Sequence, residues 1–300
     1  MRRFCRAMCL VVLATWAPAW GWWPAGHGIM THAAVKALPE GVPAFFRAGG
    51  TMIAHCSFDP DVSKNRTTPY VRDAERPEHY IDLELLGGRR LPKGRYAFIQ
   101  LCEDLDVEPE DVGLVPYAVA EWTERLAVAF AEHRTWPDNP SIQSKCLVYA
   151  GFIAHYAQDL CQPLHVTIHF DGRANPDGTS PRTGIHAKVD GLIQRLNFDP
   201  DALAAGQEIL PFADLMPGIL EELERSRSLI DRVYALEKAL PPATGPWMSV
   251  PDVVDFATER AREAARFTAA LFLTAWERSA RIELPAWLER KDDGQAARRQ

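Results

Sequence analysis

Residues 142–161 constrain this chain more than any other segment, because they are almost continuously apolar and include the run LVYAGFIAHYAQDL. Such a segment predicts a helix that is buried on most of its sides. Two polar residues within it, His155 and Asp159, stand four positions apart and therefore project from one face of the helix. Pro163 lacks a backbone donor and disfavours helical angles at the residue before it, so we expect the helix to end near that point.

The turn after this helix supplies a third residue of the same chemical kind. His165 can return toward the helix face that carries the first pair, and a second His–Asp pair follows 21 residues later at His186 and Asp190. A single pair of this spacing is common for structural reasons, whereas a packed core has no use for five such side chains from two segments. Imidazole and carboxylate are ligands that zinc prefers, so the pattern predicts a zinc site.

The remainder of the sequence also shows helical periodicity, and no alternating run is long enough to demand a sheet. The best strand candidate is Tyr80–Leu86, and two long segments, 50–78 and 170–184, are predicted to be loops. We therefore predict an all-α fold that forms a single large helical domain. Its helices are expected at 28–38, 116–134, 142–161, 185–196, 212–239 and 251–281.

The first 21 residues have the composition of a secretory signal peptide. A basic start is followed by the apolar stretch Met8–Ala17, which is too short to span a membrane, and then by small residues. Cleavage after Ala19 would leave Trp20 first, and cleavage after Gly21 would leave Trp22 first. We expect the mature protein to be secreted or periplasmic and to lack a transmembrane segment. The expected organisation is a signal peptide at 1–21, one domain at 22–288 and a disordered, charged tail at 289–300.

The cysteines that would remain after cleavage are even in number, which is typical of exported proteins with disulfides. Up to two disulfides are expected, and the sequence leaves all three pairings of the set open. Two of the cysteines lie on one predicted helix, 15 residues apart, and these two are not expected to pair with each other. The four residues are Cys56, Cys102, Cys146 and Cys161.

The chain is acidic, with a formal net charge of −7, and loss of the signal would remove three arginines and no acidic residue. An acidic surface argues against non-specific electrostatic binding of nucleic acid, which normally uses a basic surface. It does not exclude a nucleic-acid substrate, because bound zinc ions would reverse the local sign of the charge.

The two His–Asp motifs, together with the N-terminus, resemble the zinc-dependent phospholipase C and single-strand-specific (type I) nuclease family. That family includes secreted bacterial phospholipases C and the type I nucleases of fungi and plants. Its members are all-helical and secreted, hold three zinc ions, and begin with a tryptophan that ligates metal. The family's order of elements is an N-terminal Trp, a nearby His, an Asp, a His, HxxxDxxxxxH and HxxxE/D, and this chain supplies all of them across most of its expected mature length.

The resemblance implies a ligand set for each of three zinc ions. The first zinc would take Asp61, His79, His155 and Asp159. The second would take His165, His186 and Asp190, which leaves a position open for water. The third would take the backbone amino nitrogen and carbonyl of the terminal tryptophan together with His27, and Asp159 would bridge it to the first zinc.

Two of these assignments have alternatives. Trp22 stands five residues before His27, which is the spacing of the nuclease branch, whereas a start at Trp20 matches the family's usual opening; we favour Trp22. In the segment Phe-Asp-Pro-Asp the ligand can be Asp59 or Asp61. We choose Asp61, because a basic residue three positions later then matches a phosphate-contacting position of the nucleases.

Clustered zinc ions with imidazole and carboxylate ligands suit the hydrolysis of phosphodiesters by metal-activated water. The resemblance implies that Asp61 is both a ligand and a general base, and that Lys64 helps to stabilise the developing charge. His79 matches a family segment in which the next residue, an aromatic, lies near the substrate. Tyr80 and Asp82 are therefore predicted to bind substrate.

The predicted substrate is single-stranded DNA or RNA. Asp190, where the phospholipases tend to carry Glu, the position of Lys64 and the His-Tyr-Ile-Asp segment all favour the nuclease branch. The alternative is a zinc-dependent phospholipase C that acts on a phospholipid headgroup. A non-catalytic helical protein stabilised by zinc is the alternative from another class, since metal binding can itself drive folding. The protein is expected to be a monomer.

Overall fold

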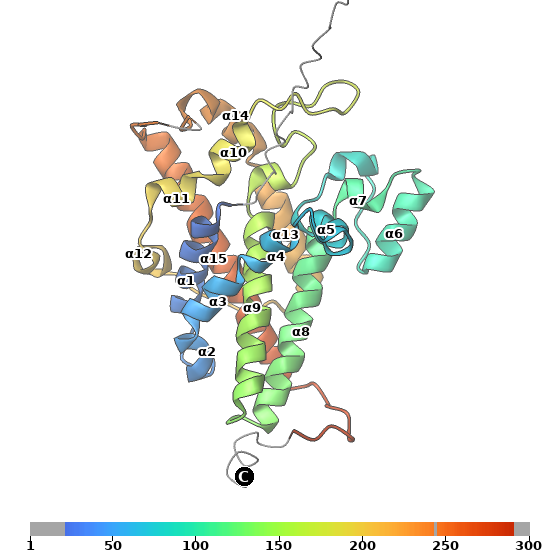
Figure 1. Ribbon diagram of the computed structural model, residues 1–300, viewed down its shortest axis with the longest axis vertical. Helices are drawn as coiled ribbons and strands as arrows, with labels where there is room; N and C mark the ends of the chain where they lie inside the picture. The colour runs from blue at the N-terminus through green and yellow to red at the C-terminus, as the bar shows by residue number, and fades with distance from the viewer. Residues whose placement is uncertain (1–21, 243–244, 291–300) are drawn as a thin grey trace, which may run out of the picture.

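The computed structural model describes residues 22–242 and 245–290, and all the named secondary-structure elements in these ranges are helices (Figure 1). The predicted all-α class is therefore confirmed. Within the described residues no helix is both long enough and apolar enough to cross a membrane. The predicted signal peptide at 1–21 and residues 291–300 of the predicted tail lie outside the described residues.

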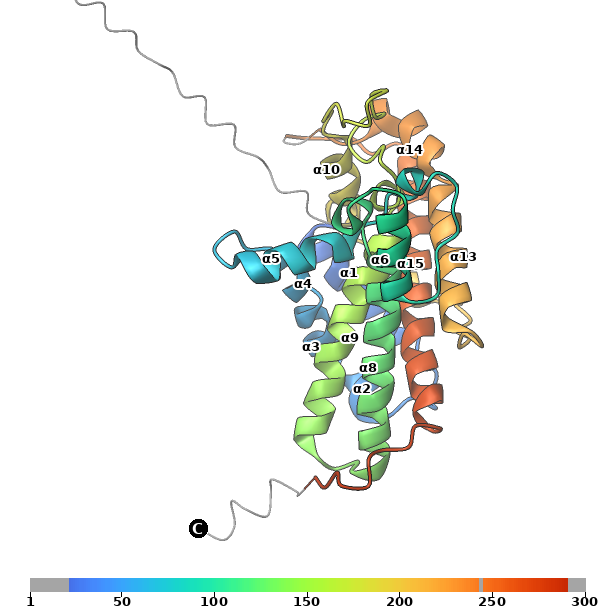
Figure 2. The same cartoon turned by 90° about the vertical axis from the view of Figure 1, so that its right-hand side faces the viewer.

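Three long helices form the centre of the molecule and run side by side in both views (Figures 1 and 2). A proline stands in the first turn of each helix, where its missing N–H group costs nothing. Asn139 caps the helix that begins at Pro140 by accepting from the N–H groups of Ser141 and Ile142. At the C-terminal end of the same helix every residue from Ile153 to Leu160 is buried, as predicted. The three helices are α8 (Val115–Thr135), α9 (Pro140–Leu160) and α15 (Pro251–Ser279).

Shorter helices surround this centre. On one side α1 (Pro24–Lys36) packs on α15 and α3 (Gly50–Cys56) packs on α9, and on the other a group around the 3₁₀ turn η1 (Arg76–His79) lies against α8 (Figure 1). The segments that reach the C-terminal end of α9 include α4 (Asp59–Ser63), η1 and the 3₁₀ turn η3 (Pro163–His165). The remaining elements are α2 (Ala44–Ala48), α5 (Pro69–Glu75), η2 (Leu83–Leu86), α6 (Arg95–Asp104), α7 (Pro109–Val112), α10 (Ile185–Asp190), α11 (Leu192–Leu196), α12 (Pro200–Ala204), α13 (Leu215–Arg227), α14 (Ile230–Leu236) and η4 (Glu237–Ala239).

The prediction of a loop at 50–78 is wrong, because α3, α4, α5 and η1 occupy most of that segment. Its prolines explain the error. Pro60, Pro69 and Pro77 stand in the first turns of α4, α5 and η1, where proline is well tolerated and does not break the helix. The correction bears on function, because α4 and η1 carry candidate ligands.

The predicted strand at Tyr80–Leu86 does not form. Tyr80 is extended (φ −150°, ψ 172°), but the next two residues donate their N–H groups to the carbonyls of His165 and Val112, which lie in irregular or helical segments. The chain then turns into η2. A short extended segment without a neighbouring strand has no ladder to join.

Two predicted helices are broken. The segment 185–196 is interrupted at Gly191, which separates α10 from α11, and glycine is a poor helix former. The segment 212–239 contains α13 and α14 with a short break between them, and η4 follows α14 directly. The segment 170–184 is irregular, as predicted, apart from an isolated bridge between Phe170 and Gly172.

The expected disulfides are absent among the described residues. All four cysteines there are free and buried. They lie on different elements: Cys56 ends α3, Cys102 lies on α6, Cys146 on α9 and Cys161 just after α9. An even number of cysteines is thus not sufficient to predict pairing, because pairing depends on a close approach that the tertiary structure does not provide.

Gly151 allows α3 to pack closely on α9. A Cβ atom at position 151 would lie 2.4 Å from the Cβ atom and 2.7 Å from the carbonyl carbon of Cys56, so the backbone of α3 would have to move. We expect Gly151→Ala to lower the free energy of unfolding by about 1–3 kcal/mol, the usual cost of overpacking a core. Denaturant unfolding would measure this. Gly41→Ala is the control, since nothing lies within 4 Å of its Cβ position, and equal effects of the two changes would contradict the prediction.

Candidate metal centre

Buried histidines and aspartates gather where α4, η1 and η3 meet the C-terminal end of α9. They form three groups, and within each group the ligand-type nitrogen and oxygen atoms all lie within 4.8 Å of one another. Every member is buried. The groups are His27, His155 and Asp159; Asp61, His79 and His155; and His165, His186 and Asp190.

Asp159 lies among four histidines: one is on its own helix, and the others come from α1, η1 and η3. Its Oδ2 atom is 2.9 Å from His79 Nδ1 and 3.2 Å from His155 Nε2. Its Oδ1 atom faces the other way and is 3.5 Å from both His27 Nε2 and His165 Nδ1. A carboxylate whose two oxygens face different ligand sets is placed to bridge two metal ions.

Asp61, in the first turn of α4, brings a second carboxylate to the centre. Its Oδ1 atom is 3.8 Å from His155 Nε2 and 3.9 Å from His79 Nδ1. Lys64 Nζ is 2.6 Å from the same oxygen. Burial opposes ionisation of this carboxyl, but the charges of His155 and Lys64 lower its pKa to about 2. Of the two candidates in this segment, Asp61 is the one in the ligand group, and Asp59 hydrogen-bonds with the Cys56 thiol instead.

The third group joins η3 to α10. Asp190 Oδ2 is 3.3 Å from His186 Nε2, and Asp190 Oδ1 is 3.8 Å from His165 Nε2. The two rings meet edge to face with centroids 4.9 Å apart. The spacing of His186 and Asp190 on α10 thus places both side chains on one face, as the sequence predicts.

Hydrogen bonds to backbone carbonyls fix the orientation of two of the rings. His155 Nδ1 lies 2.8 Å from Ser57 O, and His165 Nδ1 lies 2.9 Å from His79 O. A carbonyl oxygen can only accept, so Nδ1 carries a proton in each ring, and Nε2 is the nitrogen that remains to bind a metal ion. Partners of this kind orient metal-binding histidines in many proteins.

Several atoms of these histidines and aspartates have no hydrogen-bond partner although they are buried. Buried polar groups are normally satisfied, and each exception calls for an explanation. A cluster of metal ions would satisfy one nitrogen of each of these rings and the carboxylate oxygens, and both are ligand atoms that suit zinc. The residues therefore fit bound zinc. The atoms are His27 Nε2, His79 Nε2, Asp159 Oδ1, His165 Nε2, and Nδ1 and Nε2 of His186.

The electrostatics of the centre match this interpretation. Burial lowers the pKa of His27 to about 3, so this ring is neutral. Burial would raise the pKa of Asp159, but the charges of His155 and His165 hold it well below its usual range. Burial would lower the pKa of His165, but Asp159 and Asp190 raise it to about 9. Asp159 is therefore ionised, and His165 would release a proton on binding metal.

Trp22 is placed close to these groups. Its side chain is fully buried and its indole Nε1 donates to Gln158 O on α9, at 3.0 Å. The next residue, Trp23, donates its N–H to Asp190 O at 3.2 Å. The start of the described chain is thus tied to α9 and α10 beside candidate ligands.

The predicted substrate residues, Tyr80 and Asp82, lie between η1 and η2. The Tyr80 hydroxyl donates to Glu110 O at 2.5 Å, and the ring lies close to Gly113. Asp82 is buried, and burial together with the charge of Glu84 raises its pKa to about 8. Its carboxyl lies near enough to His165 for the two charges to interact. Of the two predicted substrate residues, Asp82 is therefore the one whose charge interacts with a candidate metal ligand.

Sequence reasoning missed the residues that hold the ligands in place. Gln158, Gln162 and Glu75 lie next to ligands, and the Glu75 carboxylate accepts from the Tyr156 hydroxyl and lies 3.5 Å from His79 Nε2. The one available signal was the presence of two glutamines within or beside the most apolar segment of the chain.

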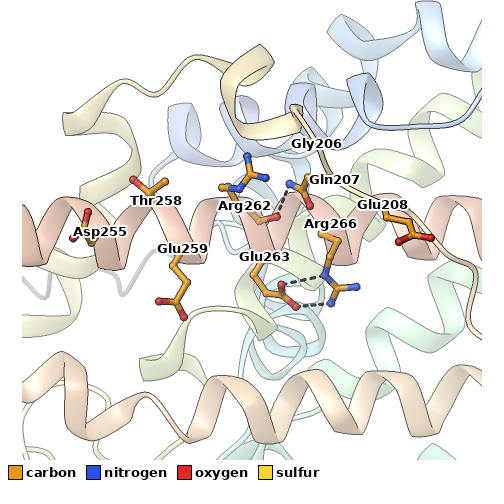
Figure 3. A pocket seen from close by; sticks show the side chains of 9 residues that line it. All are labelled: Gly206, Gln207, Glu208, Asp255, Thr258, Glu259, Arg262, Glu263 and Arg266. Atoms are coloured by element: carbon orange, nitrogen blue, oxygen red, sulfur yellow. Dashed lines mark hydrogen bonds and ion pairs between the residues drawn. The ribbon is translucent and has the colours of Figure 1, made fainter.

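A hollow on the surface of α15 lies elsewhere (Figure 3). It is lined by residues 206–208 and by one face of α15, and no candidate ligand lines it. Its two arginines are already engaged: Arg266 pairs with Glu263, and Arg262 donates to the carbonyls at the end of α12. We assign no function to it.

Comparison with known proteins gives a distant structural likeness. No protein-family model matches the chain, and no curated protein matches it. Among solved structures, the alpha toxin from Clostridium absonum matches with 13% sequence identity and a TM-score of 0.48. The match covers 86% of this chain but only 64% of the toxin chain. This likeness is too distant to carry a function, so the function must be argued from the centre itself.

Proposed function

We propose that this protein is a zinc-dependent hydrolase of phosphodiesters with three zinc ions. The observation that carries the proposal is the convergence of three buried His/Asp groups around Asp159, with unpartnered nitrogen and oxygen atoms directed inward. His155 belongs to two of the groups, and the carboxylate of Asp159 faces ligands on both of its sides. Shared ligands of this kind favour a cluster of ions over isolated structural sites.

Zinc bound there would lower the pKa of water and stabilise the charge that develops on a phosphoryl group. The residues of the chain hold and tune this centre. Asp159 bridges two ligand sets, and Asp61 acts as a ligand and as a general base. Lys64, which is 16% exposed and pairs with Asp61, adds a positive charge at the edge of the cluster.

The group of His165, His186 and Asp190 supports catalysis over a purely structural role. Three protein ligands leave a fourth position of a tetrahedral zinc ion for water, whereas structural zinc sites are usually closed by four protein ligands. A non-catalytic, zinc-stabilised protein is therefore the less favoured alternative.

We propose single-stranded nucleic acid as the substrate. Tyr80 and Asp82 lie beside the ligand His79, and an aromatic face stacks on any base and contributes ~1–3 kcal/mol. A buried carboxyl such as Asp82 can hydrogen-bond the amino or ring nitrogen of a base. The acidic overall charge is compatible with this substrate only if metal supplies the local positive charge.

A second candidate is a phospholipase C, and one observation favours it. α5 packs against η1, which carries His79, yet none of its residues is buried, and it projects from the body of the molecule (Figure 2). Tyr70 on this helix is 93% exposed, and Val62 and Val71 nearby are also exposed. Exposed apolar side chains next to a catalytic centre suit contact with a lipid surface.

The test is a side-by-side assay of mature protein with determined zinc content. We expect three zinc ions per chain and hydrolysis of bis-p-nitrophenyl phosphate that stops on chelation and returns with zinc. Single-stranded DNA, RNA and phosphatidylcholine vesicles are then compared at equal enzyme concentration. Preference for the vesicles would favour the second candidate. Bound zinc without turnover of any phosphodiester would contradict the enzymatic proposal.

A further inference from the structure

Two glutamines flank the central carboxylate. Gln158 and Gln162 are both fully buried; Gln158 lies in the last turn of α9, and Gln162 follows the end of that helix and caps η3. The side chain of each reaches a candidate ligand that comes from another segment: His27 for Gln158 and Asp190 for Gln162. Buried amides must be hydrogen-bonded, so these contacts are strongly constrained.

Gln162 acts as a donor toward Asp190. Its Oε1 atom accepts the N–H of Leu164 at 2.5 Å, which fixes the orientation of the amide because a backbone N–H can only donate. Its Nε2 atom therefore donates to Asp190 Oδ1, at 2.7 Å. A single side chain thus connects the turn that carries His165 with Asp190 on α10.

Gln158 acts as an acceptor toward His27. Metal binding at His27 Nε2 requires the ring proton on Nδ1, so Gln158 Oε1, 2.7 Å away, accepts it. The amide is held from its other end, where Nε2 donates to Thr31 Oγ1 at 3.0 Å. His27 Nε2 has no hydrogen-bond partner and lies 3.5 Å from Asp159 Oδ1.

We propose that Gln158 and Gln162 are positioning residues that set two different zinc positions, Gln158 by accepting from His27 and Gln162 by donating to Asp190. The proposal rests on the proposed zinc-dependent function. Gln158 contacts its ligand with the amide oxygen, which accepts, whereas Gln162 contacts its ligand with the amide nitrogen, which donates. The same substitution must therefore have opposite consequences at the two positions, which a general packing role would not produce.

Glutamate is the informative substitution, because it preserves the size of the side chain. Gln158→Glu keeps an acceptor for His27 and adds a negative charge, which raises the basicity of the ring as a ligand. Gln162→Glu keeps the acceptor for Leu164 but removes the donor and places an anion against Asp190. We expect Gln162→Glu to weaken one zinc by ~10–100-fold, the usual effect of losing an outer partner of a metal ligand. Gln158→Glu should keep or exceed the parental affinity.

The measurement is the zinc affinity of the whole mature chain, determined by competition with a chelator, with native mass spectrometry to count the bound ions. Neither readout depends on activity. Gln143→Glu is the matched control on the same helix, since its Nε2 atom donates to Pro137 O at the far end of α9 and it should not change zinc affinity. Gln162→Met removes the donor without adding charge, and it should weaken the same zinc if Gln162→Glu fails to fold.

Equal weakening by Gln158→Glu and Gln162→Glu would overturn the proposal, because it would show that both amides only fill space. Parental zinc affinity in both Gln162 variants would overturn it as well. These outcomes leave the zinc function intact, since the parent still binds metal. A parent chain that binds no zinc would instead remove the proposed function and this inference together.

Discussion

Asp159→Asn is expected to cost more metal and more activity than any other single ligand change. The carboxylate faces His79 and His155 with one oxygen and His27 and His165 with the other. An amide of the same shape offers one neutral oxygen and one nitrogen donor, so it cannot bridge two cations. We expect fewer than two zinc ions per chain. Activity should fall by more than the ~10–100-fold that is typical when a residue that only hydrogen-bonds to a metal ligand is changed.

Asp190→Asn is the comparison for this experiment, because Asp190 belongs to only one ligand group. It should reduce the zinc content by one ion and leave the others in place. Asp201→Asn, at an exposed pair with Lys36, controls for loss of negative charge and should change neither quantity. Full zinc occupancy in Asp159→Asn, determined by elemental analysis, would show that Asp159 does not bridge.

Extension of the mature N-terminus is expected to have the second largest effect. If the α-amino group of Trp22 is a zinc ligand, adding even two residues before it converts the amine into an amide without a free lone pair. The buried indole of Trp22 and the hydrogen bond from Trp23 to Asp190 place this end of the chain beside α9 and α10. We expect the extended protein to bind one zinc ion fewer and to lose at least ~10-fold of its activity.

The same two residues added after Gln300 serve as the control and should be without effect. N-terminal sequencing of the exported protein should return tryptophan first, and it separates Trp22 from Trp20. A protein that carries an N-terminal tag yet holds three zinc ions and full activity would exclude the amino group as a ligand. It would leave the ligand roles of the histidines untouched, because these come from other segments.

Sequence periodicity was most informative where local chemistry decides the structure. The long helices were predicted within a few residues, because their prolines, caps and apolar spacing act within one or two turns. The pairs His155/Asp159 and His186/Asp190 were predicted for the same reason, since a spacing of four residues fixes a shared helix face. The errors at Tyr80–Leu86 and at the cysteines arose where the outcome depends on a distant partner, whereas the error at 50–78 came from prolines that begin helices instead of breaking them.

What the sequence determined by itself is the set of side chains that can bind metal, because ligand chemistry belongs to the residue type. Only the tertiary structure decided which of them meet. It grouped Asp61 with His79 and His155, turned Asp59 toward Cys56, and brought Gln158 and Gln162 to ligands from α1 and α10. The hydrogen bonds that orient the rings join residues 86 to 131 positions apart, and no local pattern records contacts across such distances.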